Sequence, residues 1–419
     1  MPYKKIYFEE KTLSNGLKVI LHKDRRNPLV VISLLYHVGS KNELEGQRGF
    51  AHFFEHLMFE STKNINRGEF FRLVMSNGGL TNAYTTPDET FYYDILPSNE
   101  IALGLWLESE RMMNAKIDKK SIDIQRQVVK EEKKLSIDNL PYTSSILEVV
   151  PKHLFKKHPY RIPVIGLEKD LNQSSEMDYI NFYKTFYVPN NAVLVVSGDI
   201  DLKETEKMID YYFSAIPQSA YPIPVLAIKE ELIYEEIFSI CSEKNVVVPS
   251  IVFAYRTPAR INKDTKVIEI IHKLLSIGES SRLKNVVKKK LAANAVSFFK
   301  SMEDYGEFIV HAIKNTGVDL DVLARALDEE IERFKNEGIS IRELEKVVNN
   351  LEREFILRNS SMFRIAESLS FSHIHYKNAE RINTYLQEYK QIKVEDVKIV
   401  ANKYFNKSQR LHLKILGTK

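Results

Sequence analysis

His52 and His56 lie four residues apart in the stretch Gly49-Phe-Ala-His-Phe-Phe-Glu-His-Leu-Met-Phe59. If this stretch is helical, the two imidazoles share one face, one turn apart. Two neutral imidazoles at that spacing can bind one metal ion of the zinc type. Glu55 falls between them on nearly the same face, close enough to reach a water molecule on such a metal. The order His-x-x-Glu-His inverts the commoner His-Glu-x-x-His zinc-hydrolase helix and predicts metal-assisted hydrolysis.

The motif alone also fits a buried helix whose two histidines only pack or form hydrogen bonds. Histidine is scarce, with 11 among 419 residues. Chance would therefore give the pattern in on the order of a few per cent of such chains. The rest of the chain has to distinguish a metal site from a structural helix.

Strands and helices flank the motif in an order that can position it. In one predicted helix, at 119–135, Gln125 and Glu132 share a face, and Glu132 can point back towards the histidines. Strands are expected at 17–20, 29–36, 81–85, 89–96 and 192–197, and further helices at 68–75, 100–115, 175–186 and 203–213.

The second half of the sequence repeats the first. Residues 249–255 match 28–36, and 404–417 match 187–198, with the terminal glycines Gly198 and Gly417 lying 219 residues apart. A repeat of this length indicates a duplicated domain. We therefore expect an N-terminal metal-carrying domain at 1–215, a linker with three prolines at 216–226, and a C-terminal domain without metal at 227–419.

The duplicate of the motif falls near Ile271-His-Lys-Leu-Leu275, which has one histidine and no Glu-His partner. If the histidines served packing alone, both copies might be expected to retain them. The difference between the copies therefore favours a function for His52 and His56.

Composition limits the function classes. The 60 basic and 56 acidic residues give a net charge of only +4, and they are interspersed, so neither nucleic acid nor a membrane surface is an expected partner. Cys241 is the only cysteine, which excludes an intrachain disulfide and a thiolate metal cluster. No apolar export segment begins the sequence, so we expect a cytoplasmic protein; a periplasmic one stays open if a signal peptide has been removed.

Several stretches together resemble the pitrilysin, insulinase and mitochondrial processing peptidase family of inverted zinc peptidases. The resemblance covers nearly the whole chain. Its motifs are the stretch 49–59, Gly78-Gly-Leu-Thr-Asn-Ala-Tyr-Thr85 with Asp88-Glu-Thr90, Arg126-Gln-Val-Val-Lys-Glu-Glu132, His158-Pro-Tyr160 with Gly166, Pro189-Asn-Asn-Ala-Val-Leu-Val-Val-Ser-Gly198, Ser280-Ser-Arg-Leu283 and Gly306-Glu-Phe308. It implies an α+β fold of two duplicated α/β sandwich domains, each a largely antiparallel sheet with helices on it, forming half of a clamshell around peptides.

The resemblance also implies roles for single residues. The third zinc ligand of the family corresponds to Glu132, 76 residues after His56, with Glu131 as the near alternative. His52, His56 and Glu132 would hold one Zn²⁺ and leave a coordination position for water. Glu55 would take a proton from that water and pass it to the leaving amine.

Two further positions have implied roles in substrate binding and tuning. The strand around Asn82 and Ala83 would bind extended substrate as an added β-strand. For Asn82, a hairpin residue that satisfies its own turn is an equally good interpretation. Gln125 stands where the family often has a glutamate, seven residues before the third ligand, so a charge that tunes the site is missing.

A departure from the family concerns the second half. Active members place an Arg and a Tyr seven residues apart after the Ser-Ser-Arg-Leu segment, but here those positions fall near Lys288 and Ala295, and 284–304 contains neither residue type. We therefore expect a zinc endopeptidase subunit completed by a paralogous partner in a heterodimer, with a homodimer as the other arrangement. The alternative is a non-catalytic structural subunit of the same fold.

Overall fold

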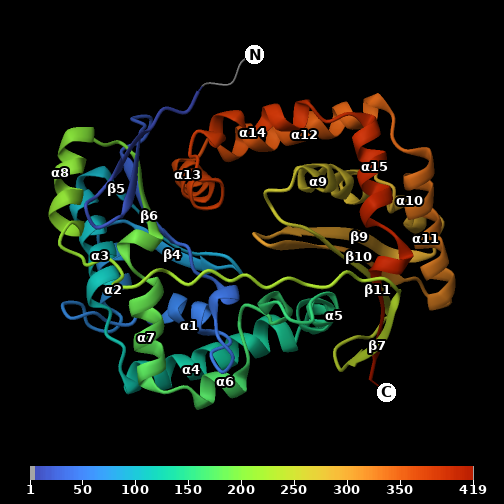
Figure 1. The fold of residues 1–419 in the computed structure, drawn as a ribbon, viewed down its shortest axis with the longest axis horizontal. Helices are drawn as coiled ribbons and strands as arrows, with labels where there is room; N and C mark the ends of the chain where they lie inside the picture. The colour runs from blue at the N-terminus through green and yellow to red at the C-terminus, as the bar shows by residue number, and fades with distance from the viewer. Residues whose placement is uncertain (1–4, 419) are drawn as a thin grey trace. The chain divides into compact units, whose positions relative to one another are not determined.

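The computed structural model describes residues 5–418 and contains two β-sheets within that part of the chain (Figure 1). The chain divides into two compact units. Unit 1 comprises Met1–Glu132, Ile162–Ala227 and Phe355–Thr384, and unit 2 comprises Lys133–Arg161, Ile228–Glu354 and Tyr385–Lys419. Each sheet lies within one unit.

The sheet of unit 1 has six strands in the order β1-β2-β6-β3-β5-β4. Only the β2–β6 pair is parallel, and all other neighbours are antiparallel. The register sets Val31 opposite Ile95 and Val196 opposite Ile32. The strands are β1 (Glu9–Thr12), β2 (Lys18–Lys23), β3 (Leu29–Tyr36), β4 (Leu80–Thr85), β5 (Thr90–Pro97) and β6 (Ala192–Gly198).

The sheet of unit 2 repeats this topology without an equivalent of β1. Its order is β7-β11-β8-β10-β9, with only β7 and β11 parallel. Strands β6 and β11 end at Gly198 and Gly417, the two glycines matched in the sequence. The expected pair of duplicated α/β folds is thus confirmed. The strands are β7 (Ile237–Glu243), β8 (Ser250–Pro258), β9 (Ala292–Ser301), β10 (Tyr305–Lys314) and β11 (Arg410–Gly417).

Helices cover both faces of the unit 1 sheet. Because successive strand residues face opposite sides, Ile32 of β3 packs against α3 while Val31 and Leu35 pack against α13. The helices are α1 (Phe50–Leu57), α2 (Glu69–Ser76), α3 (Ile101–Asn114), α4 (Lys119–Lys133), α6 (Glu168–Gln173), α7 (Glu176–Phe186), α8 (Leu202–Phe213) and α13 (Met362–Tyr376).

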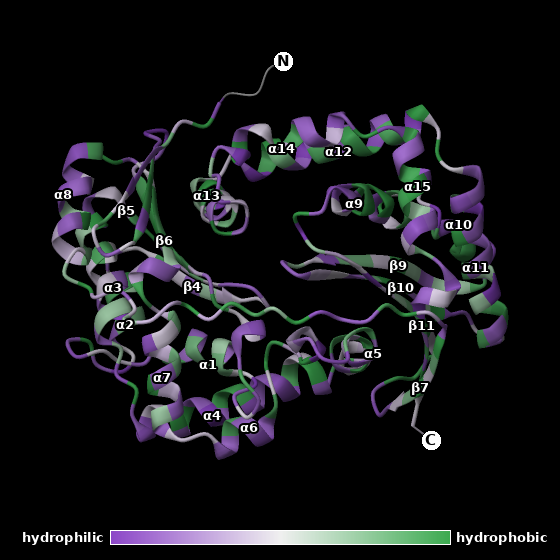
Figure 2. Cartoon of the chain, viewed as in Figure 1, coloured by the Kyte–Doolittle hydropathy of each residue, from purple (hydrophilic) through white to green (hydrophobic). Residues whose placement is uncertain are grey.

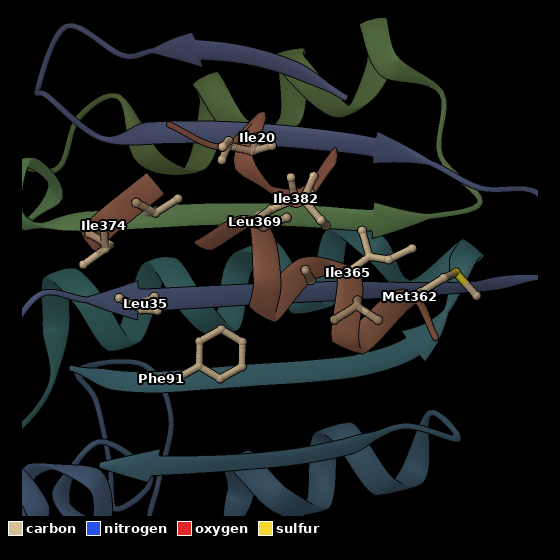
Figure 3. Packing of buried hydrophobic residues seen from close by; sticks show 13 residues of the cluster. Ile20, Leu35, Phe91, Met362, Ile365, Leu369, Ile374 and Ile382 are labelled. Carbon is tan, nitrogen blue, oxygen red and sulfur yellow. The ribbon is translucent and has the colours of Figure 1, made fainter. Parts of the chain in front are cut away.

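The core between α13 and this sheet is shown in Figure 3. Ile365 and Leu369 of α13 lie over Leu35 and Phe91, all of them almost completely buried. Burying a side chain of this size contributes about 1.5–3 kcal/mol. A helix from the second half of the sequence therefore completes the core of the first sheet.

In unit 2, α5 covers one face of the sheet, with Val150 and Leu154 packed against Leu411 and Leu413 of β11. A segment from the first half of the sequence thus helps to form the second core. The remaining helices are α9 (Lys263–Ser276), α10 (Lys284–Lys288), α11 (Leu320–Glu337), α12 (Ile341–Arg358), α14 (Arg381–Lys390) and α15 (Val394–Tyr404), with α5 at Val150–Leu154.

The helix surfaces follow the expected polarity. In Figure 2, α8 and α12 alternate hydrophobic and hydrophilic residues, as helices with one buried face do. Within residues 5–418, no helix combines the length and the apolar character needed to cross a membrane.

The elements expected in the first half match the structure to within one to three residues at their ends, for example β3 at Leu29–Tyr36 and α7 at Glu176–Phe186. The chain passes from unit 1 to unit 2 after Ala227, beside the expected linker at 216–226. Both units are discontinuous in sequence, because residues 133–161 belong to unit 2 and residues 355–384 to unit 1. The domain limits 1–215 and 227–419, which describe the two copies of the repeat, stay a prediction. Residues 1–4 and 419 lie outside the described part of the chain.

Candidate metal centre

Helix α1 buries its aromatic face and leaves the polar residues of the motif on the other side. Phe50 stacks on Tyr179 of α7 with ring centroids 4.2 Å apart, and Phe54 stacks on Phe182 at 5.5 Å. Both phenylalanines are fully buried, and each contributes about 1.5–3 kcal/mol to holding α1 on α7. This anchoring fixes the direction in which the histidines project.

The first turn of α1 is held by a side chain that precedes it. The carboxylate of Glu43 accepts hydrogen bonds from the backbone N–H groups of Gly49 (2.8 Å) and Ala51 (2.9 Å). Burial raises the pKa of Glu43 to about 8, although the two N–H donors favour the charged form. Gly49 has φ +107°, and a Cβ on Gly166 would lie 2.2 Å from the Gly49 Cα, so the two glycines permit a close backbone approach here.

His52 and His56 project from one face of α1 and converge with Glu132 of α4. Nε2 of His52 lies 3.4 Å from Oε1 of Glu132, and Nε2 of His56 lies 3.1 Å from Oε2. The imidazole rings are 4.9 Å apart at an interplanar angle of 70°. Hydrogen bonding with the two imidazoles holds the pKa of Glu132 well below its usual range. Glu132 is therefore ionised at neutral pH.

This donor set fits a zinc ion. One ligand atom from each of the three residues lies within 4.8 Å of the other two. Two imidazole nitrogens and a carboxylate oxygen are typical of catalytic zinc sites, which leave a fourth position open. Among the described residues, Nδ1 of the buried His52 has no hydrogen-bond partner. Glu131 is exposed and does not belong to the cluster, so Glu132 is the carboxylate that the geometry offers.

Glu55 lies beside the cluster without joining it. Its Oε2 accepts a hydrogen bond of 2.7 Å from Oγ1 of Thr85, at the end of β4. The side chain is half-buried. A carboxylate oriented in this way can exchange protons with a molecule bound between the three donors, which is the position that general acid–base chemistry requires.

Asn82 and Ala83 lie on β4, which forms one edge of the unit 1 sheet. Oδ1 of Asn82 accepts a hydrogen bond of 2.8 Å from the Ala83 N–H. An added strand would have to replace this bond, because the same N–H is needed for pairing. Their role in binding substrate stays a prediction.

The sequence analysis missed two residues near the centre, Glu60 and Glu43. Gln125 donates a hydrogen bond of 2.5 Å from Nε2 to Oε1 of Glu60, which is buried just after α1. Glu60 lies four residues after His56, so helical spacing could have drawn attention to it. Glu43 precedes α1 in an irregular segment, and nothing in its spacing indicated that it caps the helix.

The corresponding helix of unit 2 is α9. Nδ1 of its His272 lies 2.8 Å from Oγ of Ser297, and burial lowers the pKa of His272 to about 4. This neutral histidine is engaged in a hydrogen bond with Ser297, and the lack of a metal site in the second copy stays a prediction. Lys288 ends α10, and Ala295 is buried on β9.

Two protein-family models match parts of the chain. A family model described as "Insulinase (Peptidase family M16)" matches residues 18–167, which include the three candidate ligands. A second, "Peptidase M16 inactive domain", matches residues 177–351.

Individual relatives are similar over almost their whole length. The zinc protease PqqE of Helicobacter pylori is 29% identical over 96% of this chain and 91% of its own. The β subunit of the mitochondrial processing peptidase of Lentinula edodes is 24% identical over 95% of this chain and 87% of its own.

Among solved structures, a Helicobacter pylori protease superposes with a TM-score of 0.92 at 29% identity, covering 98% of this chain and 99% of that one. Pitrilysin superposes with a TM-score of 0.80 at 17% identity over 99% of this chain but only 46% of its own length. At that identity the second match concerns the fold alone.

Proposed function

This chain belongs to the insulinase (M16) family of peptidases, and on that premise we propose that it is a zinc metalloendopeptidase subunit that hydrolyses peptides or unfolded segments. The observation that carries the proposal is the convergence of His52, His56 and Glu132 within 4.8 Å on a rigid helical scaffold. The names of the relatives, zinc proteases among them, support the same activity.

The chemistry divides between the metal and the chain. Zinc held by His52, His56 and Glu132 would act as a Lewis acid. It would polarise the scissile carbonyl and lower the pKa of water, so that the water can lose a proton and become a nucleophile. Glu55 accepts the proton released by the attacking water and delivers it to the nitrogen of the leaving amine. The Thr85 hydroxyl orients the Glu55 carboxylate for both transfers through its 2.7 Å hydrogen bond.

The free edge of β4 offers a way to hold the substrate. A peptide aligned along Asn82 and Ala83 would gain main-chain hydrogen bonds, and Thr85 of the same strand contacts the catalytic carboxylate. Recognition through the main chain gives affinity with loose side-chain specificity. This arrangement suits unfolded segments.

We propose further that a paralogous subunit completes the enzyme, with a homodimer as the alternative, and that the two enclose the substrate in a chamber. The absence of Arg and Tyr from residues 284–304 motivates this proposal. This chain also matches only about half of pitrilysin and of the periplasmic protease PqqL of Escherichia coli, 46% and 48% of their lengths. Peptidase activity measured with and without the product of a neighbouring paralogous gene tests the need for a partner, and full activity of the isolated chain would refute it.

A non-catalytic structural subunit is the competing function. It has no use for an intact set of two histidines, Glu132 and an oriented Glu55, so the site geometry favours the peptidase. For the compartment, the cytoplasm is our expectation and the periplasm the alternative, which the periplasmic relative PqqL keeps open. Cell fractionation distinguishes the two.

The decisive experiment compares four purified proteins: the wild type, Glu55→Gln, Glu132→Gln and Glu131→Gln. We expect one zinc per chain in the wild type, full zinc content with no cleavage of a quenched fluorescent peptide for Glu55→Gln, and loss of zinc for Glu132→Gln. Glu131→Gln is the matched control, because its side chain is exposed on the same helix. Peptide cleavage by Glu55→Gln at the wild-type rate would refute the mechanism.

A further inference from the structure

The turn that follows α1 carries a buried carboxylate that contacts the helix of the third ligand. Glu60 is 6% exposed. Its Oε1 accepts the 2.5 Å hydrogen bond from Nε2 of Gln125, and its Oε2 lies 2.9 Å from Nε of Arg67. The charge of Glu60 is therefore paired with an arginine, and Oε1 accepts hydrogen bonds from both Arg67 (3.2 Å) and Gln125 of α4.

The backbone that presents Glu60 is fixed independently of this contact. The N–H of Lys116 donates to the carbonyl of Ser61 at 2.9 Å, and the hydroxyl of Thr62 donates to the carboxylate of Glu110, also at 2.9 Å. The segment after α1 is thus tied to the end of α3 and to the start of the α3–α4 connection. Glu60 can act as a rigid reference point for α4.

On α4, Gln125 and Glu132 are seven residues apart and lie on one face, about two turns from each other. Glu132 meets His56 at 3.1 Å, and Gln125 meets Glu60 at 2.5 Å. Since Glu60 follows His56 by four residues, both contacts join α4 to the same segment of chain. These two contacts hold the Gln125–Glu132 face of α4 against this segment, in addition to the burial of Ile122 and Val129 on the same helix.

We propose that Glu60 and Gln125 form a positioning pair that holds the Glu132 carboxylate in place for zinc binding. This inference rests on the proposed function of the site. It also explains the residue types: a neutral amide at position 125 can donate to Glu60, whereas a carboxylate there would place two negative charges in contact inside the protein. An uncompensated buried charge of that kind is strongly destabilising.

The experiment measures the zinc dissociation constant by competition with a chromophoric chelator, so that its readout does not depend on catalysis. Removing the partner of a ligand-orienting group typically weakens metal binding 10- to 100-fold. We expect losses in that range for Gln125→Glu and Gln125→Met, and a smaller loss for Glu60→Gln, because its amide oxygen can still accept the hydrogen bond from Gln125. Gln125→Met keeps the volume without adding charge, so it reports on the hydrogen bond even if Gln125→Glu folds poorly.

The double variant Glu60→Gln/Gln125→Glu exchanges the donor and the acceptor. It restores the hydrogen bond in reverse, and we expect its zinc affinity to recover to within about threefold of the wild type, well inside the usual 10- to 100-fold loss. Gln127→Glu is the matched control, since residue 127 is exposed on the same helix. It should leave the affinity unchanged.

Three outcomes decide the matter. Recovery in the double variant supports the positioning pair. Wild-type zinc affinity in folded Gln125→Met, with zinc lost from Glu132→Gln, overturns the pair while the proposed function stands. A wild-type protein that binds no zinc overturns both.

Discussion

Replacement of Glu43 by alanine should loosen the helix that carries both candidate histidine ligands. Glu43 is 3% exposed, and its carboxylate receives the N–H groups of Gly49 and Ala51 at 2.8 and 2.9 Å. The variant leaves both donors without an acceptor in a place that water reaches poorly. Within residues 5–418, the Glu43 carboxylate is the acceptor for both of these N–H groups.

The cost follows from these two hydrogen bonds. An unsatisfied buried N–H costs about 1–3 kcal/mol, so two of them cost about 2–6 kcal/mol. Removing a carboxyl group whose pKa burial raises to about 8 recovers part of this penalty, because its desolvation no longer opposes folding. We expect unit 1 to lose about 2–3 kcal/mol in its free energy of unfolding.

The chain contains a natural probe for this measurement. Its single tryptophan, Trp106, lies on α3 within unit 1, so tryptophan fluorescence during urea unfolding reports on that unit. Glu45→Ala is the control, because residue 45 is exposed in the same segment. Equal unfolding midpoints for the Glu43 and Glu45 variants would show that the carboxylate does not stabilise α1.

Four other outcomes follow from the structure. The pKa of Glu43 rises from 4.5 to about 8 on folding, so its contribution to stability is present at low pH and declines as pH rises through that window, and Glu43→Gln should remove this part of the slope in urea titrations by Trp106 fluorescence. Leu369→Ala empties a fully buried position between α13 and the first sheet and should cost about 2–5 kcal/mol, read by the same probe. Gly166→Ala, at φ +81°, forces a Cβ to within 2.2 Å of Gly49 and should lower the thermal midpoint by several degrees in calorimetry. Ala83→Pro removes an N–H at the free edge of β4 and should raise KM for peptides about tenfold without changing zinc content; an unchanged KM would argue against strand addition there.

The sequence predicted those features whose determinants are local. Helix α1 and its histidines follow from a spacing of four, and Leu29–Tyr36 reads as a central strand because it is apolar almost throughout. Glu132 was reachable because helical periodicity placed it on one face with Gln125 and the family resemblance distinguished it from Glu131. The signals for α1 and β3 lie within the elements themselves, whereas the choice of Glu132 also needed the family resemblance.

The features that sequence reasoning missed depend on which surfaces meet. The apolar face of α13 shows that the helix is buried, but an apolar face carries no information about which sheet covers it, and α13 packs on the sheet of the other half of the sequence. Glu60 and Gln125 are 65 residues apart, and nothing in the sequence pairs them until the turn after α1 is placed beside α4. The hydrophobic pattern of a helix or strand determines which face it buries. The neighbour that covers this face is determined by shape and by the pairing of polar groups. Gln125 illustrates this difference. In the sequence alone it looks like the loss of a charge, whereas in the structure its amide donates a hydrogen bond to the buried Glu60 carboxylate.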